Sequence, residues 1–268
     1  MKIFEAIKRG GAAVKDILPP MVIICIFNFI GAFTMLMIIG LNPTPEKIAE
    51  VTAPLFIIFA LMMLIWIFIE GGLFSSAMSV LKTGELNMGE FFGNCSKYFL
   101  RLLGLNAIGA LISTVLWLIG AFLTGVFVAL GGGKNIFFNI IGGSVLLATI
   151  IVVIIVAMPI LISQYFVVIK GGKVRESLGQ SVTFVKKYFW RTVIFFLILA
   201  ISIFTFSFIA NFIGTLLGNA IKGMGAAAIS IILTSVANGA IAVFSAACIM
   251  TYLLGIEQSE EQKVEEVK

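Results

Sequence analysis

The chain contains no histidine and only three cysteines among its 268 residues. Histidine is the commonest general base and the commonest switch at physiological pH, so its absence removes the most frequent route to acid–base catalysis. Metal sites need clustered ligands, and disulfide frameworks need paired cysteines. Cys25, Cys95 and Cys248 are instead far apart, in apolar or amphipathic runs. The sequence therefore predicts no metal site, no cofactor and no disulfide framework.

Charged side chains are also scarce. They make up 12% of the chain, whereas 60% is hydrophobic and the mean hydropathy is +1.16. Soluble domains average about 25% charged and about 45–50% apolar residues. This composition supplies more apolar surface than a soluble core needs, so it indicates a polytopic membrane protein. No nucleic-acid partner is predicted.

Six apolar runs are long enough to cross a bilayer, which takes about 20 residues per helix. These runs are 20–41, 53–79, 102–130, 138–168, 191–217 and 226–254. Short links join the first run to the second, the third to the fourth and the fifth to the sixth. The predicted fold class is therefore an all-α transmembrane six-helix bundle built from three hairpins. The first run lacks a signal-peptide cleavage pattern and is predicted to be retained.

The basic residues sort to one side of the predicted membrane. Of 18 lysines and arginines, 15 lie near the termini or in the links between hairpins, and the other three are Lys47, Lys134 and Lys222. Because cytoplasmic segments carry the excess of positive charge, we expect a multi-pass protein of the cytoplasmic membrane with both termini in the cytoplasm.

A basic segment with apolar residues at helical spacing precedes each hairpin. In the first segment, Ile3, Ile7 and Val14 share a face opposite its basic residues, and "KYFLR" at 97–101 matches "KYFWR" at 187–191 in four of five positions. The sequence predicts an interfacial amphipathic helix plus a hairpin, used three times. These repeat-like units are 1–81, 82–169 and 170–255, within a single membrane domain of 1–255 that is followed by a flexible acidic tail, 256–268.

Two roles are open for these segments. As interfacial helices they would place basic residues against anionic lipid headgroups and aromatic rings at the acyl boundary, which is the favoured interpretation. Alternatively, they would dock a cytoplasmic protein partner of unknown identity. The candidate headgroup contacts are Lys8, Arg9, Lys15, Lys97, Arg101, Lys186, Lys187 and Arg191.

One carboxylate, Glu70, lies inside the second run, in "LIWIFIEGGLFSS". A charged group at the centre of a membrane helix costs about 2.5–3.5 kcal/mol, so such a residue is by default a functional candidate. It is either a proton or cation site, or a protonated or interfacial group that fixes helix packing. Packing is favoured because no lysine or arginine lies in the interior of a predicted span to pair with Glu70; Arg191 only begins the fifth run. The other candidate members of an intramembrane polar site are Asn28, Asn106, Asn139, Asn211, Asn238 and Gln164.

Small residues and one proline mark candidate helix contacts. Gly71 and Gly72 each precede a serine by four residues, and Gly214 and Gly218 form a GxxxG pair. Such spacings let membrane helices approach closely. Pro159 is expected to kink the fourth run, because proline removes a backbone hydrogen bond.

Two stretches carry a resemblance to known families. "EGGLFSSAMSVLKTGELNMGEFFGNCSKYFLRLL" and "SQYFVVIKGGKVRESLGQSVTFVKKYFWRTV" each combine a cytoplasmic turn, an amphipathic helix and re-entry into the membrane. They resemble six-span prokaryotic membrane proteins, including the membrane domain attached to some glycerophosphodiester phosphodiesterases, and "AACIMTYLLG" is similar to their last span. The resemblance implies a fold and no activity, because nothing here matches the catalytic barrel of those enzymes.

Enzyme chemistry is not expected. No nucleophile has a recognisable base beside it, and no paired carboxylates occur in the spans. Two functions remain. The number of basic segments favours a non-enzymatic membrane module that interacts with lipid or scaffolds a partner. The alternative is a small channel or transporter for protons, cations or small solutes, with a polar interior around Glu70.

Overall fold

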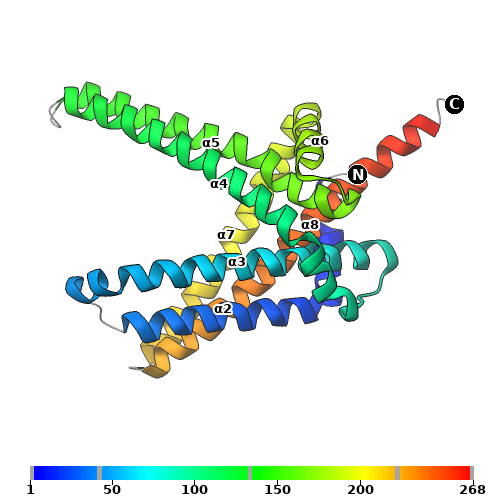
Figure 1. Cartoon of the computed structure of the whole chain (residues 1–268), viewed down its shortest axis with the longest axis horizontal. Helices are drawn as coiled ribbons and strands as arrows, with labels where there is room; N and C mark the ends of the chain where they lie inside the picture. The colour runs from blue at the N-terminus through cyan, green and yellow to red at the C-terminus, as the bar shows by residue number, and fades with distance from the viewer. Residues whose placement is uncertain (1–2, 41–43, 132–134, 221–223, 266–268) are drawn as a thin grey trace. The chain divides into compact units, whose positions relative to one another are not determined.

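A computed structural model describes residues 3–40, 44–131, 135–220 and 224–265. Every element in these ranges is helical, which confirms the all-α prediction for the described part of the chain. The elements, drawn in Figure 1, are α1 (Ile3–Ala13), the 3₁₀ helix η1 (Val14–Ile17), α2 (Leu18–Ile39), α3 (Pro45–Thr83), the 3₁₀ helix η2 (Met88–Glu90), α4 (Phe91–Leu130), α5 (Ile136–Lys170), α6 (Val174–Lys187), α7 (Phe189–Ala220) and α8 (Met224–Glu265).

Six helical stretches among the described residues are long and apolar enough to cross a membrane. They are Ile3–Ile39, Ala49–Thr83, Met88–Leu130, Ile136–Lys170, Phe189–Leu217 and Gly225–Glu260. Each overlaps one of the apolar runs expected from the sequence, so the chain has the elements of a multi-pass membrane protein. The orientation of the termini stays a prediction, and the side chains of Lys47, Lys134 and Lys222 lie outside the described part.

The chain divides into two compact units. The first unit comprises Met1–Phe99 and Trp190–Lys268, and the second comprises Leu100–Phe189. This division differs from the boundaries of the predicted repeat-like units, 1–81, 82–169 and 170–255, which were based on sequence pattern alone. A pattern of apolar runs does not determine which runs pack together, so the threefold repeat stays a prediction.

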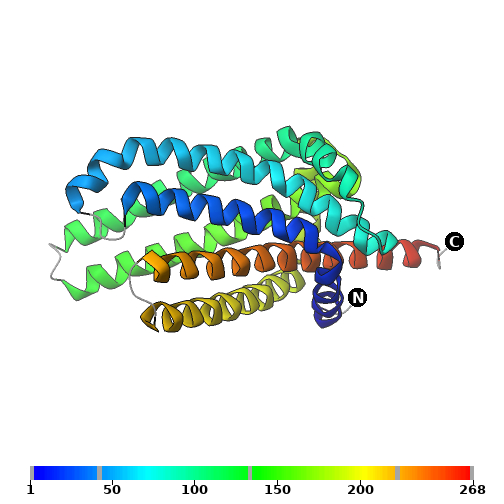
Figure 2. The ribbon, with the colours of Figure 1, turned by 90° about the horizontal axis from the view of Figure 1, so that it is seen from below.

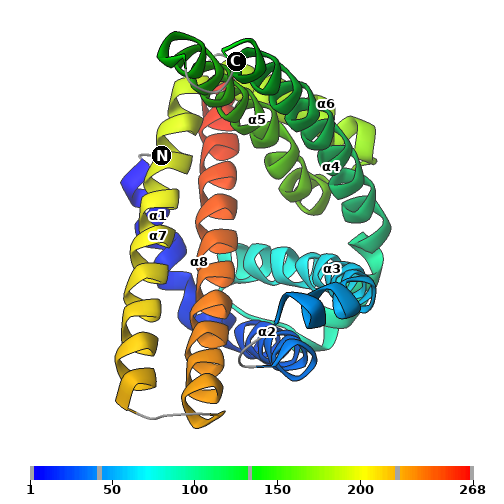
Figure 3. The same cartoon turned by 90° about the vertical axis from the view of Figure 1, so that its left-hand side faces the viewer.

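Helix α8 is the central helix of the first unit. In its most apolar window 61% of the residues are buried, against 17% or less in the other five candidate spans. Helices α1, α2 and α3 pack on α8, and α7 runs beside it in Figure 3. The α7 contact includes stacked rings of Phe195 and Tyr252, whose centroids are 4.2 Å apart. Because α8 is surrounded by other helices, most of its apolar surface is buried, whereas the other candidate spans leave more of their apolar surface exposed to lipid.

The core of the first unit lies toward the end that holds α1, the start of α2 and the end of α3. Its largest fully buried side chains include Ile17, Ile24, Leu73, Phe91, Phe195, Met250, Tyr252 and Leu253. In the opposite halves of α2 and α3, large apolar side chains such as Met37 and Phe56 are 62% and 73% exposed. The unit is therefore tightly packed at one end and open toward the other.

Three glycines of the first unit each face a cysteine at a close helix contact. A Cβ built on the glycine would lie closer than the 3.0 Å that real Cβ contacts respect. Such a Cβ would lie 2.6 Å from Cys248 Cα if placed on Gly10, 2.5 Å from Cys95 Sγ if placed on Gly72, and 2.5 Å from Cys25 Sγ if placed on Gly239. Because cysteine packs as a small apolar side chain, the three thiols fill these contacts.

The segments that precede the hairpins are held against other helices. Helix α1 buries Ala6, Gly10 and Ala13, whereas Ile3 and Ile7, on the predicted apolar face, are only half-buried. The second segment is not a separate helix, because α4 runs without a break from Phe91 to Leu130. Its first turns pack on Gly71 and Gly72 of α3. Small residues decide which face makes these contacts, since they allow the closest approach.

In the second unit, α4 and α5 lie side by side. A Cβ on Gly120 would meet the side chain of Thr149, and Thr124 Oγ1 donates to the Gly142 carbonyl oxygen over 3.4 Å. Helix α6 packs back on α5, where the rings of Phe166 and Phe184 have centroids 5.8 Å apart. The described part of this unit is thus a helix pair with one shorter helix on it.

The acidic C-terminal segment is helical as far as Glu265. The flexibility expected for 256–268 stays a prediction, and residues 266–268 lie outside the described part. Ile256 is 2% exposed, so it is anchored in the core. The glutamates, glutamines and lysine that follow are good helix formers. These two features explain why α8 continues beyond the expected end of the span.

Replacing Gly10 with alanine should destabilise the protein by about 1–3 kcal/mol, the usual cost of overpacking. The new methyl group would meet the backbone of Cys248, which cannot move aside as a flexible side chain can. Gly11→Ala is the matched control, because a Cβ there lies 3.5 Å from the Phe244 ring, an ordinary contact. Thermal unfolding in detergent measures both variants. Equal stability of the two would contradict the close approach of α1 and α8.

Candidate functional site

A groove with polar side chains opens where α2 and α3 leave the packed core and face α8. It consists of two adjoining cavities of about 450 and 270 Å³. Both are lined by Asn28 of α2 and Asn238 of α8, and Thr234 and Ser235 of α8 line the smaller one. We call this the polar groove. Its other walls are apolar: Phe27, Gly31, Ala32, Met35, Phe59, Met62, Met63, Trp66, Ile241 and Ala242.

Glu70 lies one helical turn from this groove. The indole Nε1 of Trp66, which lines the groove, donates to Glu70 Oε1 over 2.9 Å. The next seven residues, 71–77, are all buried. Glu70 therefore marks the boundary between the open half of α3 and its packed half. A hydrogen bond from its own helix satisfies part of the carboxyl group and reduces the cost of placing it there.

The other predicted members of the polar site have different local surroundings. Asn106 and Gln164 form a pair in the second unit, where Gln164 Nε2 donates to Asn106 Oδ1 over 3.1 Å. Asn211, in the first unit, is exposed and donates to the Ser207 carbonyl oxygen of its own helix over 2.8 Å. Asn139 is exposed near the start of α5. Among the predicted residues of the first unit, only Asn28 and Asn238 line one groove.

The predicted packing residues also differ in their surroundings. Gly71 and Gly72 pack tightly on α4, whereas a Cβ on Gly214 would lie 3.7 Å from Ser230 Oγ, an ordinary contact. The surroundings of Gly218 lie outside the described part. Pro159 is inside α5, which continues through it as one helix from Ile136 to Lys170.

Most of the predicted headgroup contacts are exposed lysines. Lys8, Lys15, Lys97, Lys186 and Lys187 are all exposed. Arg191 is half-buried, and Arg9 forms an ion pair with Glu5 at 2.8 Å.

Arg101 has a structural contact in the second unit. Its Nη1 donates to the carbonyl oxygen of Gly171 over 2.7 Å. Gly171 follows the last residue of α5 and has φ of +63°. A cationic side chain at a helix C-terminus satisfies a carbonyl group and complements the helix dipole. Arg101 therefore holds the end of α5, a role that its place in a basic cluster does not reveal.

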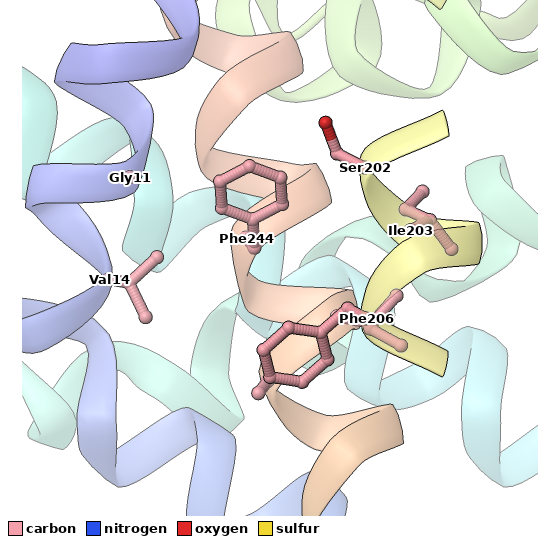
Figure 4. Close-up of a pocket in the computed structure, with 8 residues that line it drawn as sticks. Gly11, Val14, Ser202, Ile203, Phe206 and Phe244 are labelled. Carbon is pink, nitrogen blue, oxygen red and sulfur yellow. The ribbon is translucent and has the colours of Figure 1, made fainter. Parts of the chain in front are cut away.

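A second groove lies between α1, α7 and α8 in the first unit. Its volume is about 340 Å³, and we call it the apolar groove. Figure 4 shows Phe206 of α7 and Phe244 of α8 projecting into the space that Val14 borders on the α1 side. Its lining residues are Gly11, Val14, Ser202, Ile203, Phe206, Ala240, Ile241 and Phe244.

The apolar groove has no signal in the sequence. Its residues are the ordinary apolar and small residues of membrane helices, and their convergence depends on how α1 crosses α8. The Trp66–Glu70 pair is different, because its four-residue spacing is visible in the sequence. Among the residues that the structure describes, no group of three or more His, Cys, Asp or Glu is placed to hold a metal ion.

Comparison with known proteins gives a family and no activity. A family model described as a domain of unknown function (DUF7847) matches residues 1–255. No curated protein and no solved structure matches the chain.

Removal of Arg101 should loosen the C-terminal end of α5. Arg101→Gln deletes a hydrogen bond from a charged donor, which contributes about 1.5–3 kcal/mol. Hydrogen–deuterium exchange of residues 166–173 should accelerate, and thermal stability should fall. Lys186→Gln removes the same charge from an exposed site and should change neither measurement. Equal exchange in both variants would show that the contact to Gly171 contributes nothing.

Proposed function

We propose the following function for this chain, which belongs to the DUF7847 family: it is a non-enzymatic membrane module that binds a membrane lipid, with an acyl chain in the apolar groove. The observation that carries this proposal is the groove itself, about 340 Å³ of space lined by apolar side chains. Lipid tails surround the apolar surface of a spanning protein, so the natural occupant of such a groove is an acyl chain.

The basic residues of α1 support a lipid with an anionic headgroup. Lys8 and Lys15 lie three residues before and four residues after Gly11, which lines the groove, and both are exposed. Figure 2 shows α1, dark blue near the N-terminus, turned steeply away from the direction of α2. A helix lying across a spanning bundle has the orientation expected at a membrane interface, where lysines contact anionic headgroups. The cytoplasmic location of this end is part of the proposal.

The packing beyond Glu70 favours lipid binding over conduction. A conduction path needs polar groups or water along the span. In the first unit the polar groove stops near Trp66, and residues 71–77 of α3 are buried. The buried side chains of this stretch are mainly apolar, Leu73, Phe74 and Ala77, with the small polar residues Ser75 and Ser76 between them. This segment is a packed seam of the bundle.

Filling the apolar groove should displace the lipid. Ala240→Trp places an indole ring where the acyl chain lies, and the loss of contact with two methylene groups, about 0.8 kcal/mol each, corresponds to roughly a tenfold weaker affinity. Native mass spectrometry of protein released from mild detergent counts the retained lipids. Ala121→Trp is the matched control, because Ala121 is exposed on α4 and lines neither groove.

Three outcomes are distinguishable. If Ala240→Trp loses the lipid and Ala121→Trp retains it, the result supports binding of an acyl chain in the apolar groove. Equal retention by the two variants overturns its assignment. A protein that retains no lipid in any form contradicts the proposed function as a whole.

The alternative function is proton or cation transport around Glu70. The observation in its favour is that Trp66 both lines the polar groove and donates to the Glu70 carboxyl group. In proteoliposomes we expect no proton or monovalent-cation flux, because the residues beyond Glu70 are packed. Flux from the unmodified protein that disappears in Glu70→Gln would establish transport and reject the packing role.

A further inference from the structure

A pocket with two cationic side chains lies at the end of the first unit that holds α1. Its volume is about 240 Å³. Arg9 comes from α1, Lys82 from the last turn of α3, and Gln258 from α8. We call this the basic pocket. The other residues that line it are Leu81, Thr251, Leu254 and Gly255.

The three helices that form the basic pocket are fixed next to it. Gly10, beside Arg9, makes the close approach to Cys248 that joins α1 to α8. The C-terminus of α3, beside Lys82, is capped by two hydrogen bonds of 2.9 Å. Thr83 Oγ1 donates to the Ser79 carbonyl oxygen, and the Gly84 amide donates to the Val80 carbonyl oxygen. The backbone that carries each cation is therefore held in place, and a ligand need not order it on binding.

The donors of the basic pocket fit an oxygen anion. Arg9 Nη2 forms an ion pair with Glu5 Oε1 at 2.8 Å, which occupies part of the guanidinium group. A guanidinium group has five N–H donors, so others remain to bind a ligand. The lysine ammonium and the glutamine amide add further donors. Thr251 Oγ1 donates to its own helix, to the Ala247 carbonyl over 2.7 Å, so it serves as a small polar wall. Two cations with several N–H donors match a phosphate group, which carries charge and several acceptor oxygens.

We propose that the basic pocket is a binding site for a phosphate group, recognised by Arg9, Lys82 and Gln258. The group belongs either to the headgroup of an anionic phospholipid or to a soluble phosphate compound. The basic pocket shares no lining residue with the apolar groove. The site therefore stands apart from the function proposed above and remains even if the groove holds no acyl chain.

The test uses Lys82→Gln in the full chain, because Lys82 is exposed and its replacement leaves the core unchanged. Arg175→Gln is the matched control, since it removes one positive charge from an exposed site that lies outside the pocket and is not among the candidate headgroup contacts. Two probes are compared. One is inorganic phosphate added to detergent-solubilised protein, read by thermal shift against an equal concentration of chloride. The other is phosphatidic acid in phosphatidylcholine nanodiscs, read by native mass spectrometry of the retained lipid.

We expect Lys82→Gln to weaken phosphate-group binding about tenfold or more, as for loss of a charge-assisted contact, and Arg175→Gln to leave it unchanged. Loss confined to phosphatidic acid identifies a lipid headgroup. Loss of stabilisation by inorganic phosphate identifies a soluble compound. Gln258→Leu should weaken binding of the same probe, although it does not change the net charge of the protein. Equal binding by the unmodified protein and Lys82→Gln would overturn the site, because Lys82 would then contribute no attraction. Equal loss in Lys82→Gln and Arg175→Gln would also overturn it, because the attraction would then be a general effect of positive charge.

Discussion

The close approach of α1, α2 and α3 to their neighbours depends on glycines that face cysteines. Gly10 meets Cys248, Gly239 meets Cys25, and Gly72 meets Cys95, each at a distance that leaves no room for a Cβ. Helices that meet in lipid gain little from the hydrophobic effect, so close backbone contact and van der Waals packing hold them together. Two of these contacts, Gly10 with Cys248 and Gly239 with Cys25, join α1 and α2 to α8, and the third joins α3 to the start of α4. The most apolar window of α8 is accordingly 61% buried.

The same contacts divide the first unit into a packed end and an open end, and the candidate sites follow this division. The polar groove opens toward the exposed halves of α2 and α3, with Asn28 and Asn238 on its walls. The basic pocket lies at the packed end, beside Gly10 and the closed terminus of α3. A rigid end suits recognition of a small charged group, because the ligand need not order the backbone when it binds.

Much of the fold could be predicted from the sequence, and rather less of the site. Apolar runs of sufficient length predict membrane helices because a bilayer has a set thickness. The Trp66–Glu70 pair was within reach too, because it is local. Arg101 shows the limit, because its guanidinium holds the end of α5 through the carbonyl oxygen of Gly171, 70 positions away in the sequence.

The amino-acid sequence by itself determined the class of the protein, the six apolar helices and the scarcity of groups for acid–base or metal chemistry. These properties depend on composition and on local spacing. Only the tertiary structure decided that α8 is central, that the acidic segment after residue 255 is helical, and that Arg9, Lys82 and Gln258 line one pocket. Helix packing in lipid depends on steric fit between small residues, and an apolar sequence contains many such residues without showing which of them meet.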